Sequence, residues 1–370
     1  MQLTLENKLI LQIAQFRHYD RENLKGNSEG LLDWTEILGD LMYNRLGGIA
    51  YKVLMDSMPI ALNHEIEFLL FQIYEIQKLR TTNNLKVLYD LSDALEQAEI
   101  QYAFLKGSIL ANSIYPIGCR VSKDIDLLVN AKDLTKVGKV LESLGYVQGF
   151  YNKESNKIDP ASRQEIIYRR LNMGEVVPYQ KLVDMPALKV TEVDVNFSLD
   201  WVAQGTEGAV KKFLSEPYYY ETGNGRTLRS LPPEYFLAYL CVHLYKEAVV
   251  INWVEWQRDL LLYKFLDLYA FITDPKINLN WDKFIDLCTQ NGIQMECYYA
   301  LEHAKTFFPI LCKDNGLDYA LLSIRPDSVD YLHEVIDTVD RNKKYKWDSN
   351  IVERFFNMKR VNELSGLQVK

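Results

Sequence analysis

Apolar residues recur three and four positions apart along residues 1–98, which is the spacing of one face of a helix. The clearest stripes are Leu31, Trp34, Ile37, Leu38 and Leu41, and then Leu85, Leu88, Leu91, Leu95 and Ala98. The segment Met1–Phe16 is apolar on one side but contains Glu6 and Lys8, which suits an amphipathic helix rather than a signal peptide. We therefore predict a helical N-terminal region over residues 1–98.

The hydrophobic period changes at residue 99, where Ile100, Tyr102 and Phe104 alternate with their neighbours as in a strand. The elements predicted from here on are a strand over 100–104, a helix over 109–114 capped by Ser108, a strand over 123–129, a helix over 131–144 and a strand over 190–197. A polar stretch, Asn152–Gln164, separates the last two. This order of strands and helices predicts a mixed β-sheet domain over residues 99–231.

From Pro232 onward the helical spacing returns. The predicted helices cover Tyr235–Tyr245, Trp256–Phe271, Trp281–Gln290 and Glu296–Phe307. We therefore expect a helical C-terminal domain over residues 232–370. The predicted fold class is α+β, with a mixed sheet domain between two helical regions.

The amino-acid composition is that of a globular protein and disfavours several other classes. The chain has 370 residues, 48% of them hydrophobic, which is enough for a substantial core. Its five cysteines are odd in number and show no CxxC spacing, so neither a zinc site nor a disulfide framework is indicated and a cytoplasmic location is expected. No apolar run is long enough to span a bilayer, so no membrane association is expected.

A formal net charge of −8 disfavours binding to nucleic acid, whose phosphates require a basic surface. The one candidate basic patch is Arg341, Lys343, Lys344 and Lys346. Such a run is more often a solvated helix end or loop than a binding site.

The strongest candidate chemistry lies in the predicted strand over 123–129. Residues two apart in a strand point to the same side, so Asp124 and Asp126 place two carboxylates on one face. Two like charges this close repel unless a cation neutralises them, and magnesium is held by one or two carboxylates together with substrate phosphates. A DxD tripeptide alone is more often a pair of surface charges, so its surroundings decide its meaning.

A strand-to-helix turn, Lys106-Gly107-Ser108, precedes these aspartates. Glycine lets backbone approach a ligand, and free N–H groups at a helix start attract phosphate. The same residues are also ordinary capping chemistry. The chain contains neither a P-loop nor a dinucleotide-binding fingerprint, so a different phosphate-handling fold is required.

Taken together, Leu105-Lys106-Gly107-Ser108, Arg120 and Asp124-Ile125-Asp126-Leu127 resemble the hG[GS] and [DE]h[DE]h motifs of the nucleotidyltransferase superfamily that includes DNA polymerase beta. With the later Val193-Asp194-Val195, they are similar to a bacterial branch called uncharacterised nucleotidyltransferases. The resemblance is sharpest over Ile100–Tyr146 and persists at Thr191–Leu199. It implies a nucleotidyltransferase-like mixed sheet domain.

The resemblance also implies a set of site residues. Asp124, Asp126 and Asp194 would be the catalytic ligands of two Mg²⁺ ions, and Glu192 is the alternative third carboxylate. Gly107 and Ser108 would hold nucleotide phosphates. Lys106, Arg120 and Lys123 would offset charge on the leaving pyrophosphate, although Lys106 can equally reach solvent and Arg120 can pair with Asp124.

We expect an enzyme that moves a nucleoside monophosphate from a nucleoside triphosphate, with ATP the favoured donor, to a hydroxyl of a small-molecule acceptor. Two alternatives stay open from sequence. One is nucleotidylation of a protein or tRNA acceptor, supported only by the Lys343–Lys346 segment. The other is a non-catalytic nucleotide-binding scaffold, which the complete set of Asp124, Asp126 and Asp194 argues against.

Overall fold

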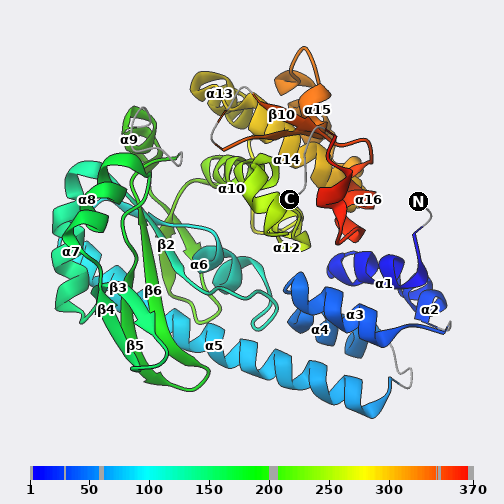
Figure 1. Ribbon diagram of the computed structural model, residues 1–370, viewed down its shortest axis with the longest axis horizontal. Coiled ribbons are helices and arrows are strands. Elements are labelled where there is room, and N and C mark those ends of the chain that lie inside the picture. Colours follow the sequence, from blue (N-terminus) through cyan, green and yellow to red (C-terminus); the bar gives the residue numbers. More distant parts are fainter. Residues whose placement is uncertain are drawn as a thin grey trace. The chain divides into compact units, whose positions relative to one another are not determined.

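A six-stranded mixed sheet forms the centre of one unit of the protein, residues 68–236 (Figure 1). The computed structural model describes residues 3–28, 31–57, 62–199, 207–338, 340 and 343–365. The strands run in the order β1-β2-β6-β5-β3-β4, and β2 lies parallel to β6 while the other neighbours are antiparallel. Their bounds are β1 Tyr102–Phe104, β2 Ile125–Val129, β3 Val147–Asn152, β4 Lys157–Pro160, β5 Tyr179–Met185 and β6 Leu188–Asn196.

Helices and a hairpin complete this unit. They are α5 His64–Gln97, whose first turn belongs to the other unit, α6 Gly107–Ile109, η1 Leu110–Ile114, η2 Ala131–Asp133, α7 Leu134–Ser143, α8 Arg163–Asn172, α9 Glu207–Ser215, β7 Tyr218–Glu221 and β8 Thr227–Ser230. The segment η1 is a single π-helical turn that continues α6.

The sheet has an apolar face because alternate residues of its central strands are apolar. Leu127 of β2 and Val193 and Val195 of β6 are almost fully buried. Helix α7 buries Val137 and Leu141, and Val137 lines the same cavity as Val195. Each such side chain taken out of water contributes about 1.5–3 kcal/mol to folding. The acidic residues of the same strands are thereby directed to the opposite face.

The second unit, residues 1–67 with 237–370, is mainly helical. Its elements are α1 Leu5–Ala14, α2 Arg21–Ser28, α3 Trp34–Tyr43, α4 Gly47–Ser57, α10 Pro233–Val249, which begins in the sheet unit, α11 Ile251–Glu255, α12 Leu262–Ile272, α13 Trp281–Asn291, α14 Gln294–Phe307, η3 Pro309–Lys313, α15 Asn315–Ile324, η4 Asp330–His333, β9 Glu334–Ile336, β10 Lys344–Lys346, α16 Ile351–Phe356 and η5 Arg360–Glu363.

The structure confirms the predicted α+β class. The strands predicted over 100–104, 123–129 and 190–197 are β1, β2 and β6, and the helix predicted over 131–144 is η2 with α7. Strands β3, β4 and β5 and helix α8 were not predicted. Among the described residues, no helix combines the length and hydropathy that crossing a bilayer requires.

One predicted helix, Trp256–Phe271, is wrong in its first half. Helix α11 ends at Glu255 and α12 begins at Leu262. Between them Gln257 has a φ of 56°, which a continuous helix does not allow. Asp259 lies 2.5 Å from the guanidinium of Arg360 in a pair that is almost fully buried. This distant ion pair stabilises a loop where the local apolar spacing predicts a helix.

Candidate active site

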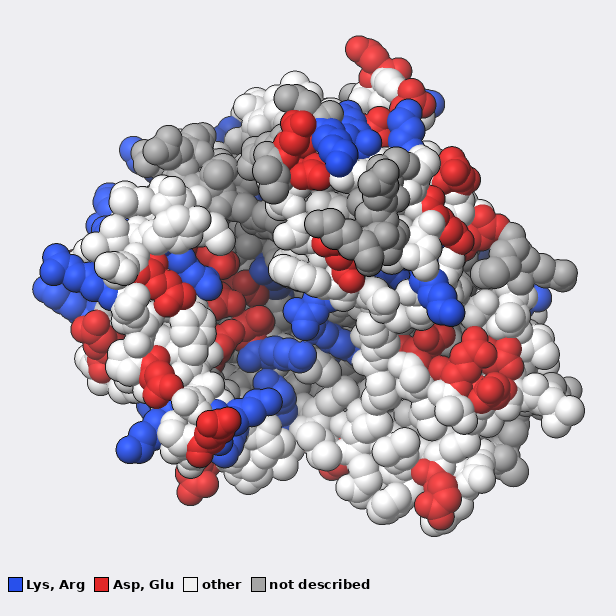
Figure 2. Space-filling model, in the orientation of Figure 1, with Lys and Arg blue, Asp and Glu red and all other residues white. Residues whose placement is uncertain are grey.

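The parallel pairing of β2 with β6 brings the acidic residues of two distant segments together. In this register Ile125 lies opposite Val193, and Asp126 lies opposite Asp194. Because side chains alternate along a strand, Asp124 and Asp126 share a face with Glu192 and Asp194. We call these four side chains the acidic cluster. On the face that Figure 2 shows, acidic side chains gather over the sheet, with lysine and arginine side chains beside them.

Three members of the acidic cluster converge closely enough to bind one cation. Carboxylate oxygens of Asp124, Glu192 and Asp194 all lie within 4.8 Å of one another. Burial raises the pKa of Asp194 to about 8, with further contributions from Asp126, Asp124, Glu192 and Glu175. Hard carboxylate oxygens are the ligands that Mg²⁺ takes in proteins. A divalent cation would relieve the repulsion between the neighbouring carboxylates. The residues therefore fit a magnesium site.

Asp126, the fourth member, is neutralised by a cation of the chain itself. The Nζ of Lys106 lies 2.7 Å from Oδ1 of Asp126. Burial raises the pKa of Asp126 to about 6, and Lys106 opposes this rise. Asp126 is buried, so its charge depends on Lys106 in this structure. The lysine predicted to meet phosphate thus lies inside the acidic cluster.

Lys106 is held there by a strained turn. The N–H of Ser108 donates to the carbonyl of Leu105 at 3.2 Å, which closes a β-turn around Lys106 and Gly107. Lys106 has φ 44° and ψ −122°, close to the first central position of a type II′ turn, where glycine is usual. A non-glycine residue in such a conformation costs about 1–3 kcal/mol. The strained residue is thus the one whose ammonium pairs with Asp126.

Gly107 allows the segment before β2 to approach the turn. A Cβ atom at position 107 would lie 2.4 Å from Oγ and 2.9 Å from Cβ of Ser122. Ser122 in turn donates from its Oγ to the carbonyl of Asp124 at 2.8 Å. The absence of a side chain at Gly107 therefore lets Ser122 fix the backbone of Asp124 beside the turn.

The remaining predicted phosphate contacts lie around this turn. Ser108 is 2% exposed and its hydroxyl has no hydrogen-bond partner within the described part of the chain. It lines a cavity of about 10 Å³ with Asp124, which is room for about one water molecule. Buried Arg120 donates from its guanidinium to the carbonyl of Val121. Lys123 is exposed. Whether Ser108, Arg120 and Lys123 meet a nucleotide stays a prediction.

Gln180 is a site residue that sequence reasoning missed. It lies opposite Glu192 in the β5–β6 register and is buried. Its amide nitrogen donates to the Glu192 carboxylate, and its amide oxygen accepts from the backbone N–H of Tyr151. Both ends of the amide are thus engaged, which orients Glu192. The alternation along 190–197 indicates which face Glu192 occupies, but not its partner, because β5 was not predicted.

The predicted basic patch lies in the other unit. Lys344 of β10 forms an ion pair of 2.6 Å with Glu334 of β9, and Lys346 lies 4.0 Å from the same carboxylate. Arg341 lies outside the described residues. Two of the lysines therefore already share an acidic partner within this hairpin.

Replacement of Gly107 by alanine is expected to destabilise the protein by about 1–3 kcal/mol, because its Cβ would overlap Ser122. Urea denaturation measures the change. A second change, Ser122→Gly, removes the overlapping atoms and should restore part of the lost stability, because it also removes the hydrogen bond from Ser122 to the Asp124 carbonyl. Gly208→Ala is the matched control, since a Cβ there meets no atom within 4 Å. Equal effects at Gly107 and Gly208 would contradict this account of the turn.

The acidic cluster also predicts a pH dependence of the metal-free protein. The pKa of Asp194 is raised from 3.8 to about 8, so the folded chain binds this proton more tightly than the unfolded chain. This contribution to stability is present at low pH and is lost as the pH rises from 3.8 to about 8. Asp194→Asn should therefore flatten the fall in Tm between pH 5 and pH 8, by roughly 2–4 °C for each kcal/mol of repulsion relieved.

Differential scanning calorimetry with a chelator present measures this. Glu154→Gln, at an exposed carboxylate of the same unit, is the control and should follow the wild-type curve. A fall in Tm that is as steep in Asp194→Asn as in the wild type would show that the acidic cluster does not carry this repulsion.

Comparison with known proteins places the chain in a family. A family model described as "Uncharacterised nucleotidyltransferase" matches residues 31–309. Among solved structures, the chain is similar to an antigenic nucleotidyltransferase-like protein from Paracoccidioides brasiliensis, with 15% identity, a TM-score of 0.37, and coverage of 63% of this chain and 91% of that one. No functionally curated protein matches the sequence.

Proposed function

Because the chain belongs to the family of uncharacterised nucleotidyltransferases, we propose that it transfers a nucleoside monophosphate from ATP to a hydroxyl group of a small-molecule acceptor. The observation that carries this proposal is the convergence of Asp124, Glu192 and Asp194 within 4.8 Å, with Asp126 beside Asp194 in the strand register. Three half-buried carboxylates this close repel one another, and a bound cation would offset that repulsion.

The reaction forms a bond between the acceptor oxygen and the α-phosphorus of ATP. The bond from that phosphorus to the bridging oxygen of the β-phosphate breaks, and pyrophosphate leaves with the electron pair. The acceptor proton passes to a carboxylate, for which Asp194 is the candidate because it belongs to the group of carboxylates that would face the acceptor hydroxyl. Asp124, Glu192 and Asp194 would hold magnesium, which supplies positive charge to the phosphate oxygens and to the attacking oxygen.

Lys106 would act on the leaving group. Lys106 lies between the end of β1 and the start of α6. Its ammonium lies 2.7 Å from the Asp126 carboxylate. Binding of a divalent cation to the acidic cluster would supply Asp126 with another positive partner. Lys106 would then pair with the oxygens of the leaving pyrophosphate, where a fixed positive charge stabilises the developing negative charge.

The charges of the chain favour a small acceptor over a nucleic acid. The formal net charge is −8, and Lys344 and Lys346 of the candidate basic patch share Glu334. A nucleic acid would need a row of unpaired cations. A small hydroxyl compound needs only a place beside the acidic cluster.

The proposal is tested with two preparations of ATP, labelled at the α- or the γ-phosphate, incubated with magnesium and a deproteinised metabolite extract. The α-label is expected in a new small molecule and the γ-label in pyrophosphate. Asp124→Asn and Asp194→Asn should each lower transfer roughly 100-fold, and the control Glu154→Gln should leave it unchanged. Transfer of the γ-label to the acceptor would show phosphoryl transfer instead, and labelling that survives Asp194→Asn would place the chemistry elsewhere.

Two replacements of Lys106 separate its charge from its strain. Lys106→Met and Lys106→Gly both remove the ammonium, and each is expected to lower kcat roughly 10–100-fold. Glycine adopts φ 44° without strain, so Lys106→Gly should be about 1 kcal/mol more stable than Lys106→Met. Rate measurements and urea denaturation check the two effects. Lys132→Met, at an exposed lysine of η2, is the control, and a kcat for Lys106→Gly equal to that of the wild type would remove Lys106 from the mechanism.

A further inference from the structure

A cavity of about 280 Å³ lies on the face of the sheet opposite the acidic cluster. It is partly open to solvent and is lined by residues of α7, α8, β3, β5 and β6 and by Val176, all in the sheet unit. Val195 of β6 lines it, whereas its neighbour Asp194 belongs to the acidic cluster on the other face. The cavity is therefore separate from the proposed active site. We call it the α7–α8 cavity.

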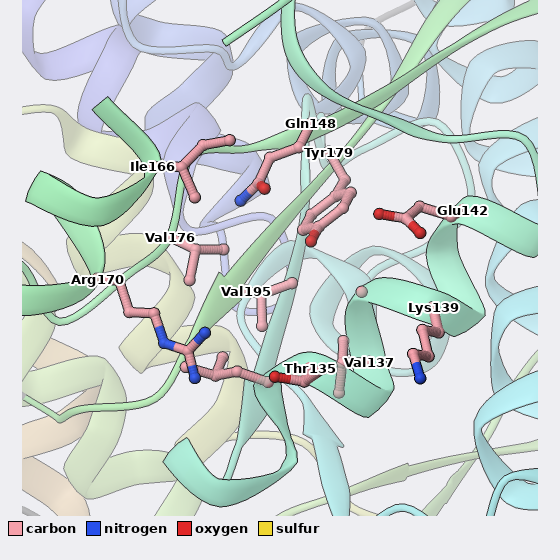
Figure 3. A pocket seen from close by; sticks show the side chains of 12 residues that line it. Thr135, Val137, Lys139, Glu142, Gln148, Ile166, Arg170, Val176, Tyr179 and Val195 are labelled. Atoms are coloured by element: carbon pink, nitrogen blue, oxygen red, sulfur yellow. The ribbon is translucent and has the colours of Figure 1, made fainter. Parts of the chain in front are cut away.

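Apolar and polar side chains line the α7–α8 cavity in similar proportion, and several of the polar groups point into it. Figure 3 shows the Arg170 guanidinium, the Tyr179 hydroxyl and the Gln148 amide directed toward the same space, with Val176 and Val195 between them. Lys139 extends away from that space. Apolar surface together with convergent polar groups is usual in small-molecule sites.

Tyr179 is only 7% exposed, and its hydroxyl lies at the surface of the cavity. Burial raises the pKa of Tyr179, with a further contribution from Glu142, while Arg170 opposes the rise. The hydroxyl therefore stays protonated near neutral pH and is available as a hydrogen-bond donor.

The sequence of α7 preserves room for this hydroxyl. Gly138 lies in the interior of α7, where glycine weakens a helix relative to alanine. A Cβ atom at position 138 would lie 2.8 Å from the oxygen of Tyr179. The glycine lets the tyrosine hydroxyl lie against the helix at the centre of the cavity.

Arg170 sets the charge of the expected ligand. Its guanidinium is exposed and forms no ion pair with any described residue. A guanidinium binds a carboxylate or phosphate through two parallel hydrogen bonds. Glu142, the acidic residue of the lining, is also exposed.

We propose that the α7–α8 cavity binds a small organic oxyanion, with the anionic group on Arg170 and Tyr179 and an apolar body against Val137, Val176 and Val195. The volume admits a compound of about the size of a substituted aromatic ring. The ligand is defined by a carboxylate or phosphate group on an apolar body, and the two sources of that charge are distinguished by experiment.

The test titrates the full-length protein with benzoate, phenyl phosphate and the uncharged benzamide, followed by ligand-observed NMR. At least one anion is expected to bind with a Kd near 1 mM, and benzamide at least ten times more weakly. Binding of benzoate alone identifies a carboxylate site, and binding of phenyl phosphate alone a phosphate site. Absence of binding by both anions below 10 mM would overturn the proposal, as would equal binding of benzamide.

Single substitutions test whether the anion binds in the α7–α8 cavity. Arg170→Gln, at an exposed residue, should weaken anion binding at least tenfold without loss of folding, and Tyr179→Phe should weaken it severalfold. Asp194→Asn removes a member of the acidic cluster on the other face and should leave binding unchanged, so this result stands apart from the fate of the proposed transfer activity. Binding that is unaffected by Arg170→Gln, or lost in Asp194→Asn, would place the anion elsewhere.

Discussion

The arrangement of the sheet unit depends on the parallel pairing of β2 with β6, which places acidic side chains of two segments on one face. The apolar residues between them, such as Leu127 and Val193, are buried on the other face, so the register cannot shift by one residue without burying the acids in the core. Packing therefore places carboxylates together at a partly buried position, and burial first, with the neighbouring carboxylates adding to it, raises the pKa values of Asp126 and Asp194. A bound cation would offset the repulsion between these carboxylates.

The chain offsets part of this repulsion by itself. Lys106 neutralises Asp126 from a turn conformation that suits glycine, and Gly107 makes room for the Ser122 contact that places Asp124. Gln180 holds Glu192 from the neighbouring strand. Among the described contacts, no cation of the chain pairs with Asp124, Glu192 or Asp194. These three residues are the ones with metal-ligand spacing.

Local patterns predicted the elements that carry this site. The alternation around Asp124 and Asp194 gave β2 and β6 and their acidic face, because period 2 is a property of each strand alone. The partners of these residues were not predictable in the same way. Gln180 meets Glu192 only through the register of β5, and the Asp259–Arg360 pair that interrupts the predicted helix Trp256–Phe271 joins residues far apart in sequence. The α7–α8 cavity likewise arises from packing of separate elements.

The central claim is that Asp124, Glu192 and Asp194 together bind a divalent cation. The most direct measurement is anomalous diffraction from crystals soaked with Mn²⁺ and a non-hydrolysable ATP analogue. The account predicts an anomalous peak within coordinating distance of carboxylate oxygens from all three residues, with the triphosphate on the same face of the sheet. A peak bound elsewhere, or an acidic cluster that contains no metal while Lys106 still pairs with Asp126, would contradict it.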